Sequence, residues 1–342
     1  MNSGKRNLHV DALRGIAMLL VVLGHTMTGC TTGSDDSFLY NIVWSLQMPL
    51  FILISGYVTR YSRGITDGAE LWKYVKRRTI AYIFPWAVWS FIVRGVIFGE
   101  KKFLDIKWLL WHMDSGYWFL ATIWTISMIF GISTFIARKS SKDSELKQQV
   151  STLILYIVGM VVLIAVGFVA GLSFFAIKLT LYYMPFYFAG YLYGQHSDKI
   201  LEISRGKTII DVVVAVCFTI WLIIITRYHL YALPDSGVGI ILRFLSSGTG
   251  CIAVCGLFKA MFDNTPESVC RPLRWIGSHS LEIYLFHYLL LDLLLPEIRP
   301  GFPSIVAYCL IAANFIITNL LCVGVICLIS QSSILKKILG MK

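Results

Sequence analysis

Arg14 and His25 share one apolar stretch near the start of the chain, HVDALRGIAMLLVVLGHT. Their spacing of eleven residues is close to three helical turns, so both side chains would lie on nearly the same face, about 16 Å apart. Asp11 falls on the same stripe. A neutral imidazole can take a proton from a hydroxyl, and a guanidinium is a permanent cation. The pattern predicts a helix facing a polar cavity, with a cation near one mouth and a base deep inside; alternatively, Arg14 reaches back to the interface beside Asp11.

A second group of polar residues lies near the other end of the chain, in IGSHSLEIYLFHYLLL. Ser280, Tyr284 and His287 follow one another at spacings of four and three, which aligns them on one helix face, whereas Glu282 points elsewhere. Ionisable groups inside an apolar span cost free energy, so the set predicts residues that support a substrate or donate to an oxyanion. Hydrogen bonds between neighbouring helices are the alternative.

Other polar residues are weaker candidates. Gln47 and Ser55 interrupt the apolar WSLQMPLFILISGY, where polar and small residues commonly serve helix packing. Trp118, in YWFL, is either a site residue or part of an interfacial aromatic belt. Arg77 and Arg78 lie in the loop LWKYVKRRTIAYIF, where they either bind phosphate or fix the orientation of the chain in a membrane.

The composition of the 342-residue chain indicates a polytopic membrane protein. It is 57% hydrophobic and 14% charged, against about 45–50% and about 25% in soluble domains, which excludes intrinsic disorder, a disulfide scaffold and an ordinary cytosolic enzyme. The net charge of +11 lies in short clusters, so no nucleic-acid partner is expected. Cys251 and Cys255 share a helix face without a His or a second Cys pair, so no metal is expected.

Ten stretches satisfy the requirement of about 20 mostly apolar residues for a membrane-spanning helix. They are residues 10–28, 38–59, 79–98, 117–137, 150–170, 174–194, 208–226, 239–261, 280–298 and 304–330. Most of the 30 Lys and Arg residues fall between spans on the side of the N-terminus, so the positive-inside rule places both termini in the cytoplasm. We expect an all-α integral membrane protein, a bundle of about ten transmembrane helices that forms one domain over residues 1–342 with no additional soluble domain.

These motifs resemble those of the membrane acyltransferase-3 family. The likeness rests on DALRGIAMLLVVLGH, PLFILISGY, the basic stretch before Pro85, YWFL and IGSHSLEIYLFH, which together run from Asp11 to His287. The first and last of these motifs in combination are specific, whereas YWFL and the basic stretch alone are weak. Tyr82 departs from the pattern, because many members have a second arginine three residues before the proline.

The resemblance implies an O-acyltransferase, most often an O-acetyltransferase, that moves an acyl group from cytoplasmic acyl-CoA to a hydroxyl of a cell-envelope glycan or lipid-linked saccharide. It implies that Arg14 contacts the CoA, that His25 is the essential histidine, and that Arg77 and Arg78 meet the CoA phosphates. The residues expected to support the substrate or the transition state are Asp11, Ser55, Trp118, Ser280, Tyr284 and His287.

The resemblance also implies a prokaryotic cytoplasmic membrane, with the lipid bilayer, an acyl-CoA and a saccharide acceptor as partners. Some members carry an extra hydrolase-like domain that completes the transfer outside. This chain ends just after its last span, so we expect it to finish the reaction alone or with a partner protein.

A secondary transporter or flippase for a saccharide or lipid-linked intermediate is the alternative function, because buried His, Arg and Glu would also suit proton-coupled transport. No internal repeat relates two halves of the sequence, and the ionisable residues concentrate in the first and ninth spans, which favours the enzyme. An acyltransferase needs Arg14 and His25 to face a CoA-sized cavity open to the cytoplasm, whereas a transporter needs a central site that opens to either side.

Overall fold

The protein is α-helical throughout the part of the chain that the computed structural model describes. The described residues are 8–62, 64–113, 116–140, 144–202, 206–262 and 265–333. Within them the only β-type pairing is an isolated bridge between Thr32 and Gly301. The predicted all-α fold is confirmed.

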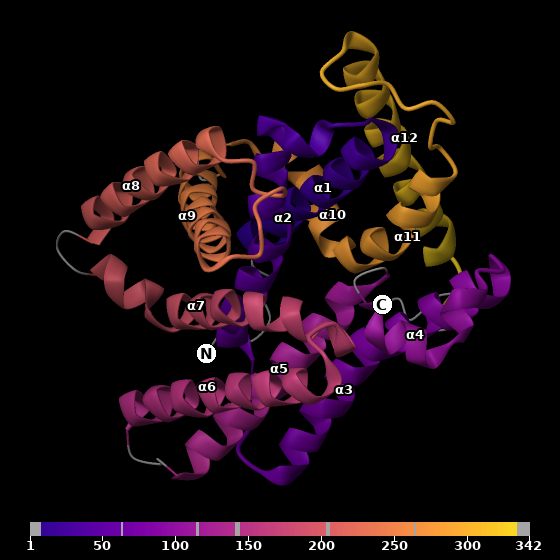
Figure 1. The fold of residues 1–342 in the computed structure, drawn as a ribbon. Helices are drawn as coiled ribbons and strands as arrows, with labels where there is room; N and C mark the ends of the chain where they lie inside the picture. Colours follow the sequence, from indigo (N-terminus) through magenta and orange to yellow (C-terminus); the bar gives the residue numbers. More distant parts are fainter. Residues whose placement is uncertain are drawn as a thin grey trace. The chain divides into compact units, whose positions relative to one another are not determined.

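The α-helices are labelled in Figure 1 in chain order. They are α1 (Leu8–Cys30), α2 (Phe38–Tyr57), α3 (Gly68–Ala87), α4 (Ile106–Trp111), α5 (Trp118–Ser140), α6 (Glu145–Ala170), α7 (Ile177–Glu202), α8 (Gly206–Arg227), α9 (Gly237–Phe262), α10 (Glu267–Ser278), α11 (Ser280–Asp292) and α12 (Ile305–Ser330). A π-helix, Val88–Ile97, continues α3 without a break.

Eight helical segments of the described residues are long and apolar enough to cross a membrane. They correspond to α1, α2, α3 with its π-helical continuation, α5, α6, α8, α9 and α12. The predicted spans 174–194 and 280–298 are not among the eight, so the count of ten stays a prediction. The chain is a multi-pass membrane protein.

The extent predicted for the ninth span, 280–298, is wrong. α11 ends at Asp292 after 13 residues, and its length of about 20 Å is shorter than the hydrocarbon core of about 30 Å. α11 is also bent away from α10 at His279, where φ is −111° and ψ is 22°. The apolar run continues beyond Asp292, but Pro296 has no backbone N–H with which to extend the helix. Hydropathy therefore overstated the helix.

The chain divides into two compact units. The first unit comprises Met1–Tyr61 and Phe186–Gln331, and the second comprises Ser62–Pro185 and Ser332–Lys342. α7 begins in the second unit and ends in the first.

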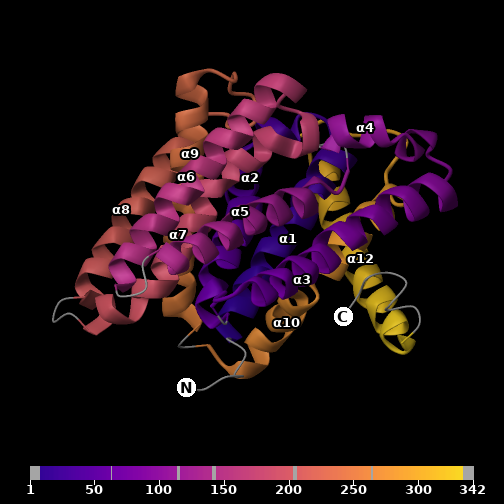
Figure 2. The same ribbon diagram turned by 90° about the horizontal axis from the view of Figure 1, so that it is seen from below.

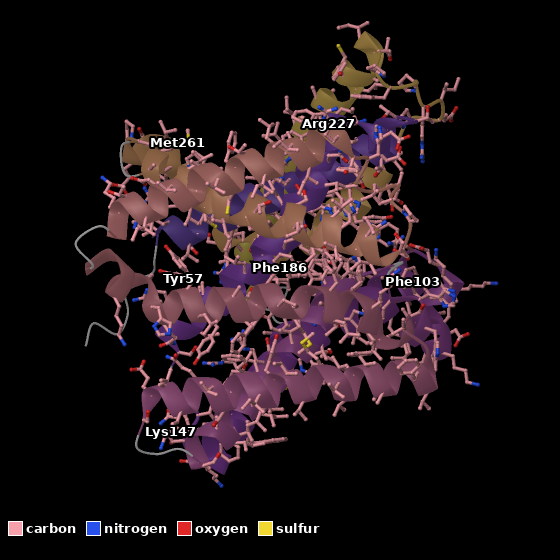
Figure 3. The ribbon with its side chains drawn as sticks, turned by 60° about the vertical axis from the view of Figure 1, so that its left-hand side comes forward. Tyr57, Phe103, Lys147, Phe186, Arg227 and Met261 are labelled. Atoms are coloured by element: carbon pink, nitrogen blue, oxygen red, sulfur yellow. The ribbon has the colours of Figure 1, made fainter. Side chains whose placement is uncertain are left out.

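In the first unit α1 packs against α2, α10, α11 and α12 (Figure 1). The closest approach is to α10, because a Cβ added to Gly15 would lie only 2.2 Å from the backbone oxygen of Leu273. α8 and α9 pack against each other as an antiparallel pair, and Figure 3 shows their last turns, at Arg227 and Met261, at opposite ends. The residues at the centre of this unit are thus carried by α1.

In the second unit α5 lies between α3 and α6 and packs against both (Figure 2). The Tyr74 hydroxyl of α3 donates to the Ser127 carbonyl of α5 over 3.0 Å. The Tyr156 hydroxyl of α6 donates to the Met184 carbonyl in the first half of α7, also over 3.0 Å. These tyrosines fix the spacing of the helices through buried polar contacts.

The basic stretch predicted to be a loop before span 79–98 is helical instead. α3 begins at Gly68, and the side chain of Asp67 caps it by accepting a hydrogen bond from the Glu70 amide over 2.8 Å. The residues that follow are mostly strong helix formers such as Ala, Glu, Leu, Lys and Arg. Arg77 and Arg78 therefore lie on α3, where hydropathy alone does not reveal a helix.

Candidate functional site

Three aromatic rings meet where α1 passes α11. The ring centres of His25 and His287 are 5.3 Å apart, with an interplanar angle of 43°. The Tyr288 ring meets His25 edge-on, also at 5.3 Å. His25 is half-buried, whereas His287 is only 2% exposed. The structure therefore brings together the two histidines that the sequence placed in separate motifs, far apart along the chain.

A hydrogen bond to the backbone determines the tautomer of His287. His287 Nδ1 lies 3.0 Å from the carbonyl oxygen of Ile283, which can only accept a hydrogen bond, so Nδ1 carries the proton. In the neutral ring Nε2 then has a lone pair and no hydrogen. This Nε2 is buried and has no hydrogen-bond partner among the described residues. An unsatisfied acceptor thus lies in the ring that packs against His25.

α1 and the α11 segment approach closely on this side. A Cβ on Gly29, one turn beyond His25, would lie 2.8 Å from Leu295 Cδ2 and 3.8 Å from Leu291 Cδ2. The Tyr284 ring lies 5.9 Å from that of His287, and Tyr284 is buried. Tight packing therefore holds the imidazoles in place.

Gln47 of α2 lies against the residue before His25. A Cβ on Gly24 would come within 3.0 Å of Gln47 Oε1 and 2.9 Å of Val43 Cγ1. Gln47 Oε1 is buried and, within the part of the chain that is described, has no hydrogen-bond partner. The sequence made Gln47 a weak candidate and favoured a packing role, because no spacing rule links a lone glutamine to a histidine on another helix.

Arg14 lies three helical turns from His25, towards the start of α1. Its Nη1 is 3.8 Å from Asp11 Oδ1, and the Arg14 side chain keeps 29% of its exposure while that of Asp11 keeps 5%. α10 crosses α1 at this level, where Gly15 meets Leu273. The cation therefore remains accessible at one end of a helix whose other end carries the histidine.

Two other predicted residues of the first unit contact mainly their own helix or the adjoining bend. The Ser55 hydroxyl donates to the Phe51 carbonyl over 2.8 Å. Ser280 is the half-buried first residue of α11, next to the bend at His279. The roles assigned to Ser55 and Ser280 stay predictions.

A family model described as an acyltransferase domain matches residues 7–329, almost the whole chain. The chain belongs to the acyltransferase-3 family. It is 26% identical over 202 residues to nodulation protein NolL of Mesorhizobium japonicum, covering 56% of this chain and 49% of that protein. It is 23% identical over 134 residues to nodulation protein NolL of Sinorhizobium fredii, covering 34% and 36%. The chain thus spans half or less of the length of these relatives, and no solved structure matches it.

Three candidates from the acyltransferase-3 motifs belong to the second unit. Arg78 Nη1 donates to the Tyr82 hydroxyl over 3.1 Å, so the tyrosine that departs from the family pattern contacts an arginine of the basic stretch. Arg77 is exposed on α3. Trp118 stacks on Tyr183 with ring centres 5.7 Å apart. Their place in a site with His25 stays a prediction.

Tyr288 is a further residue of the site, and the sequence patterns did not single it out. It follows Tyr284 at a spacing of four, the same signal that selected Ser280 and Tyr284. Among the described residues no group of three or more His, Cys, Asp or Glu side chains is arranged to hold a metal ion. The groups that lie around His25 in this acyltransferase domain are the imidazole of His287, the phenol of Tyr288 and the carboxamide of Gln47.

Proposed function

We propose that this protein is an integral-membrane O-acetyltransferase that moves an acetyl group from cytoplasmic acetyl-CoA to a hydroxyl of a cell-envelope saccharide or lipid-linked glycan. Family membership supports the reaction class. The observation that carries the assignment of the site is the 5.3 Å pairing of His25 with His287. The enzyme would work in a prokaryotic cytoplasmic membrane, with ten spans and both termini in the cytoplasm, alone or with a partner protein.

The residues around His25 fit the thioester end of acetyl-CoA. Gln47 Oε1 is a buried acceptor atom with no hydrogen-bond partner in the described residues. Buried polar atoms are normally satisfied, so a ligand with an N–H or O–H donor suits it. Arg14 lies about 16 Å from His25 along α1, which matches a donor with phosphates at one end and a thioester at the other. Arg14 is too far from His25 to stabilise an oxyanion there, so we assign it to CoA binding.

In the proposed reaction His25 is the general base. One ring nitrogen takes the proton of the acceptor hydroxyl while the hydroxyl oxygen attacks the thioester carbonyl carbon. The carbon–sulfur bond breaks, His25 returns the proton to the sulfur, and the products are an acetyl ester and CoA. Alternatively, His25 attacks the thioester first and carries the acetyl group as acetyl-histidine before passing it to the acceptor hydroxyl. This route would leave acetyl label on the protein in the absence of acceptor.

His287 acts on His25 rather than on the oxyanion. Because its Nδ1–H is committed to the Ile283 carbonyl, neutral His287 can accept a hydrogen bond at Nε2 but has no proton to donate there. We assign it to accept from the second ring nitrogen of His25, which orients that ring and stabilises the imidazolium as it forms. Tyr284 and Ser280 stay the candidates for donation to the oxyanion or the sugar.

Titration of the purified protein with acetyl-CoA tests the proposal. Wild type should bind acetyl-CoA, and Arg14→Ala should bind at least about tenfold more weakly because a charge-assisted contact to phosphate is lost. His25→Ala should bind as wild type does but fail to transfer the acetyl group. Arg227→Ala, which removes an exposed arginine at the end of α8, is the matched control and should bind normally. A wild-type protein without affinity for acetyl-CoA would sink the proposal and make proton-linked saccharide transport the hypothesis to test.

A further inference from the structure

Gln47 is a half-buried residue near His25 whose Oε1 atom is buried, and the proton transfers proposed for His25 and His287 give it no part. Its Oε1 atom is 3.0 Å from the position that a Cβ of Gly24 would take, and it accepts no hydrogen bond from the described residues. The hydroxyl donors on this turn of α1 are already used: Thr26 donates to the Val22 carbonyl over 2.8 Å and Thr28 to the Gly24 carbonyl over 3.1 Å. Neither hydroxyl is left to satisfy Gln47, so its Oε1 atom can accept a hydrogen bond from a ligand.

The packing of α2 on α1 fixes the level at which Gln47 lies. Tyr40 and Val43 share an apolar cluster with Met27, near the end of α1. Val43 and Gln47 both approach Gly24, which precedes Met27 on α1. The two helices are therefore antiparallel here, and residues later in α2 lie closer to the Arg14 end of α1. Gln47 therefore lies beside the turn that carries His25, on the side that leads to Arg14.

The position of Gln47 along α1 corresponds to the pantetheine arm of the acetyl donor. With its thioester at His25 and its phosphates at Arg14, acetyl-CoA would extend its pantetheine arm past Gln47. Two methylene groups beyond the sulfur, the arm carries a secondary amide, whose N–H is its first hydrogen-bond donor. The carboxamide oxygen of Gln47 can accept a hydrogen bond from this N–H.

The geometry points to Gln47 as a donor-binding residue that accepts a hydrogen bond from the amide N–H nearest the sulfur of acetyl-CoA. This inference rests on the proposed function. Gln47 holds the arm so that the thioester carbonyl stays beside His25, and it makes recognition depend on the arm as well as on the phosphates. A bare acetyl thioester without the amide would lack this contact.

Binding of two donors tests the inference. One is acetyl-CoA, and the other is an analogue in which the N–H nearest the sulfur is replaced by an ester oxygen. Wild type should bind the analogue about tenfold more weakly, because a buried acceptor is left unsatisfied. Gln47→Met, which keeps the length of the side chain without its polar atoms, should bind acetyl-CoA about tenfold more weakly than wild type does and bind both donors equally.

Asn314→Leu supplies the matched control. Asn314 is a buried amide of α12 whose Nδ2 donates to Cys30 Sγ over 3.0 Å, so its loss perturbs the same unit without touching Gln47. This variant should keep the preference for acetyl-CoA over the ester analogue. The wild-type comparison needs no variant, so the inference is tested even where Gln47→Met does not fold.

The outcomes separate the inference from the proposed function. If wild type binds neither donor, the proposed function fails. If wild type binds both donors equally, or if Gln47→Met keeps the preference, acetyl-CoA binding stands and the role of Gln47 is wrong. Unchanged donor binding with a loss of acetyl transfer in Gln47→Met would also overturn the inference, because it would assign Gln47 to the acceptor.

Discussion

α1 and α8 belong to the same unit, and their hydropathy and burial run in opposite directions. α1 has a mean hydropathy of 1.5 in its most apolar stretch and 61% of that stretch is buried, whereas α8 has a mean hydropathy of 2.7 with 17% buried. In a soluble protein the more apolar helix would be the more buried one. Here the lipid solvates apolar side chains, so α8 can expose Val212, Val216 and Ile223.

The contrast between α1 and α8 shows which polar side chains of this protein indicate a functional site. α2, α10, α11 and α12 pack around α1, which buries Asp11 and leaves Arg14 and His25 half-buried. A polar atom that this packing leaves without a partner, such as His287 Nε2, is costly to bury and therefore points to a ligand or a reaction. Substitutions around α1 should show whether its buried surroundings serve chemistry, packing or both.

Loss of His287 should have the largest effect among these tests. His287→Leu keeps an apolar side chain of moderate size against His25 but removes the acceptor, so acetyl transfer should fall about 10²-fold while acetyl-CoA affinity stays near the wild-type value. The measurement is release of CoA thiol that depends on added envelope saccharide, together with acetyl-CoA titration.

His229→Leu is the control for that experiment, because His229 is exposed beyond the end of α8 and its Nδ1 lies 2.7 Å from the Asp36 carbonyl. It should transfer acetyl at the wild-type rate. A His287→Leu protein as active as wild type would show that this buried histidine serves only packing. The greater burial of α1 relative to α8 would then have no catalytic role.

The sequence predicted the parts of this architecture that depend on periodicity. The span 10–28 lies within α1, and the spacing of four and three in the last motif selected His287, which does contact His25. The pairing itself could not be predicted, because no rule of spacing within one helix specifies which residues of two distant helices meet. Gln47 was only a weak candidate for the same reason, because the sequence does not reveal its contact with Gly24 on another helix.

Hydropathy failed at helix ends, where backbone geometry decides the structure. The apolar run after Asp292 looked like a continuing span, yet the bend at His279 and the early end of α11 make that helix short. The opposite error occurred at α3, whose charged first turns are helical because Asp67 caps them. Apolar composition measures compatibility with lipid, whereas caps and proline determine where the hydrogen-bonded ladder starts and stops.

Gly15→Ala tests the packing half of the comparison. The new methyl would meet the Leu273 backbone oxygen at 2.2 Å, and a backbone atom in a helix cannot move aside as a flexible side chain does. We expect a loss of about 1–3 kcal/mol in the free energy of unfolding, seen as a lower melting temperature in detergent. Gly324→Ala on α12 is the control, because nothing lies within 4 Å of its new methyl. Equal melting temperatures for the two variants would contradict the close crossing of α1 and α10.

The smallest effect should come from a polar pair outside the predicted spans. Arg60 Nη2 donates to Asp198 Oδ2 over 2.5 Å, and the Asp198 side chain is 69% exposed. This hydrogen bond holds the pKa of Asp198 below its ordinary value of 3.8. A carboxylate whose pKa is lowered by folding stabilises the fold above its unfolded pKa, and that contribution disappears as the pH falls through the lower folded pKa.

Asp198→Asn should therefore lower the melting temperature only slightly at neutral pH, and the difference from wild type should vanish in acid below the folded pKa of Asp198. Asp211→Asn, which removes another exposed carboxylate near the start of α8, controls for the change in surface charge and should show no such convergence. Because the Asp198 side chain is 69% exposed, water screens the Arg60–Asp198 pair and its contribution to stability is small. A large loss of stability in Asp198→Asn at neutral pH would mean that this pair is shielded from water.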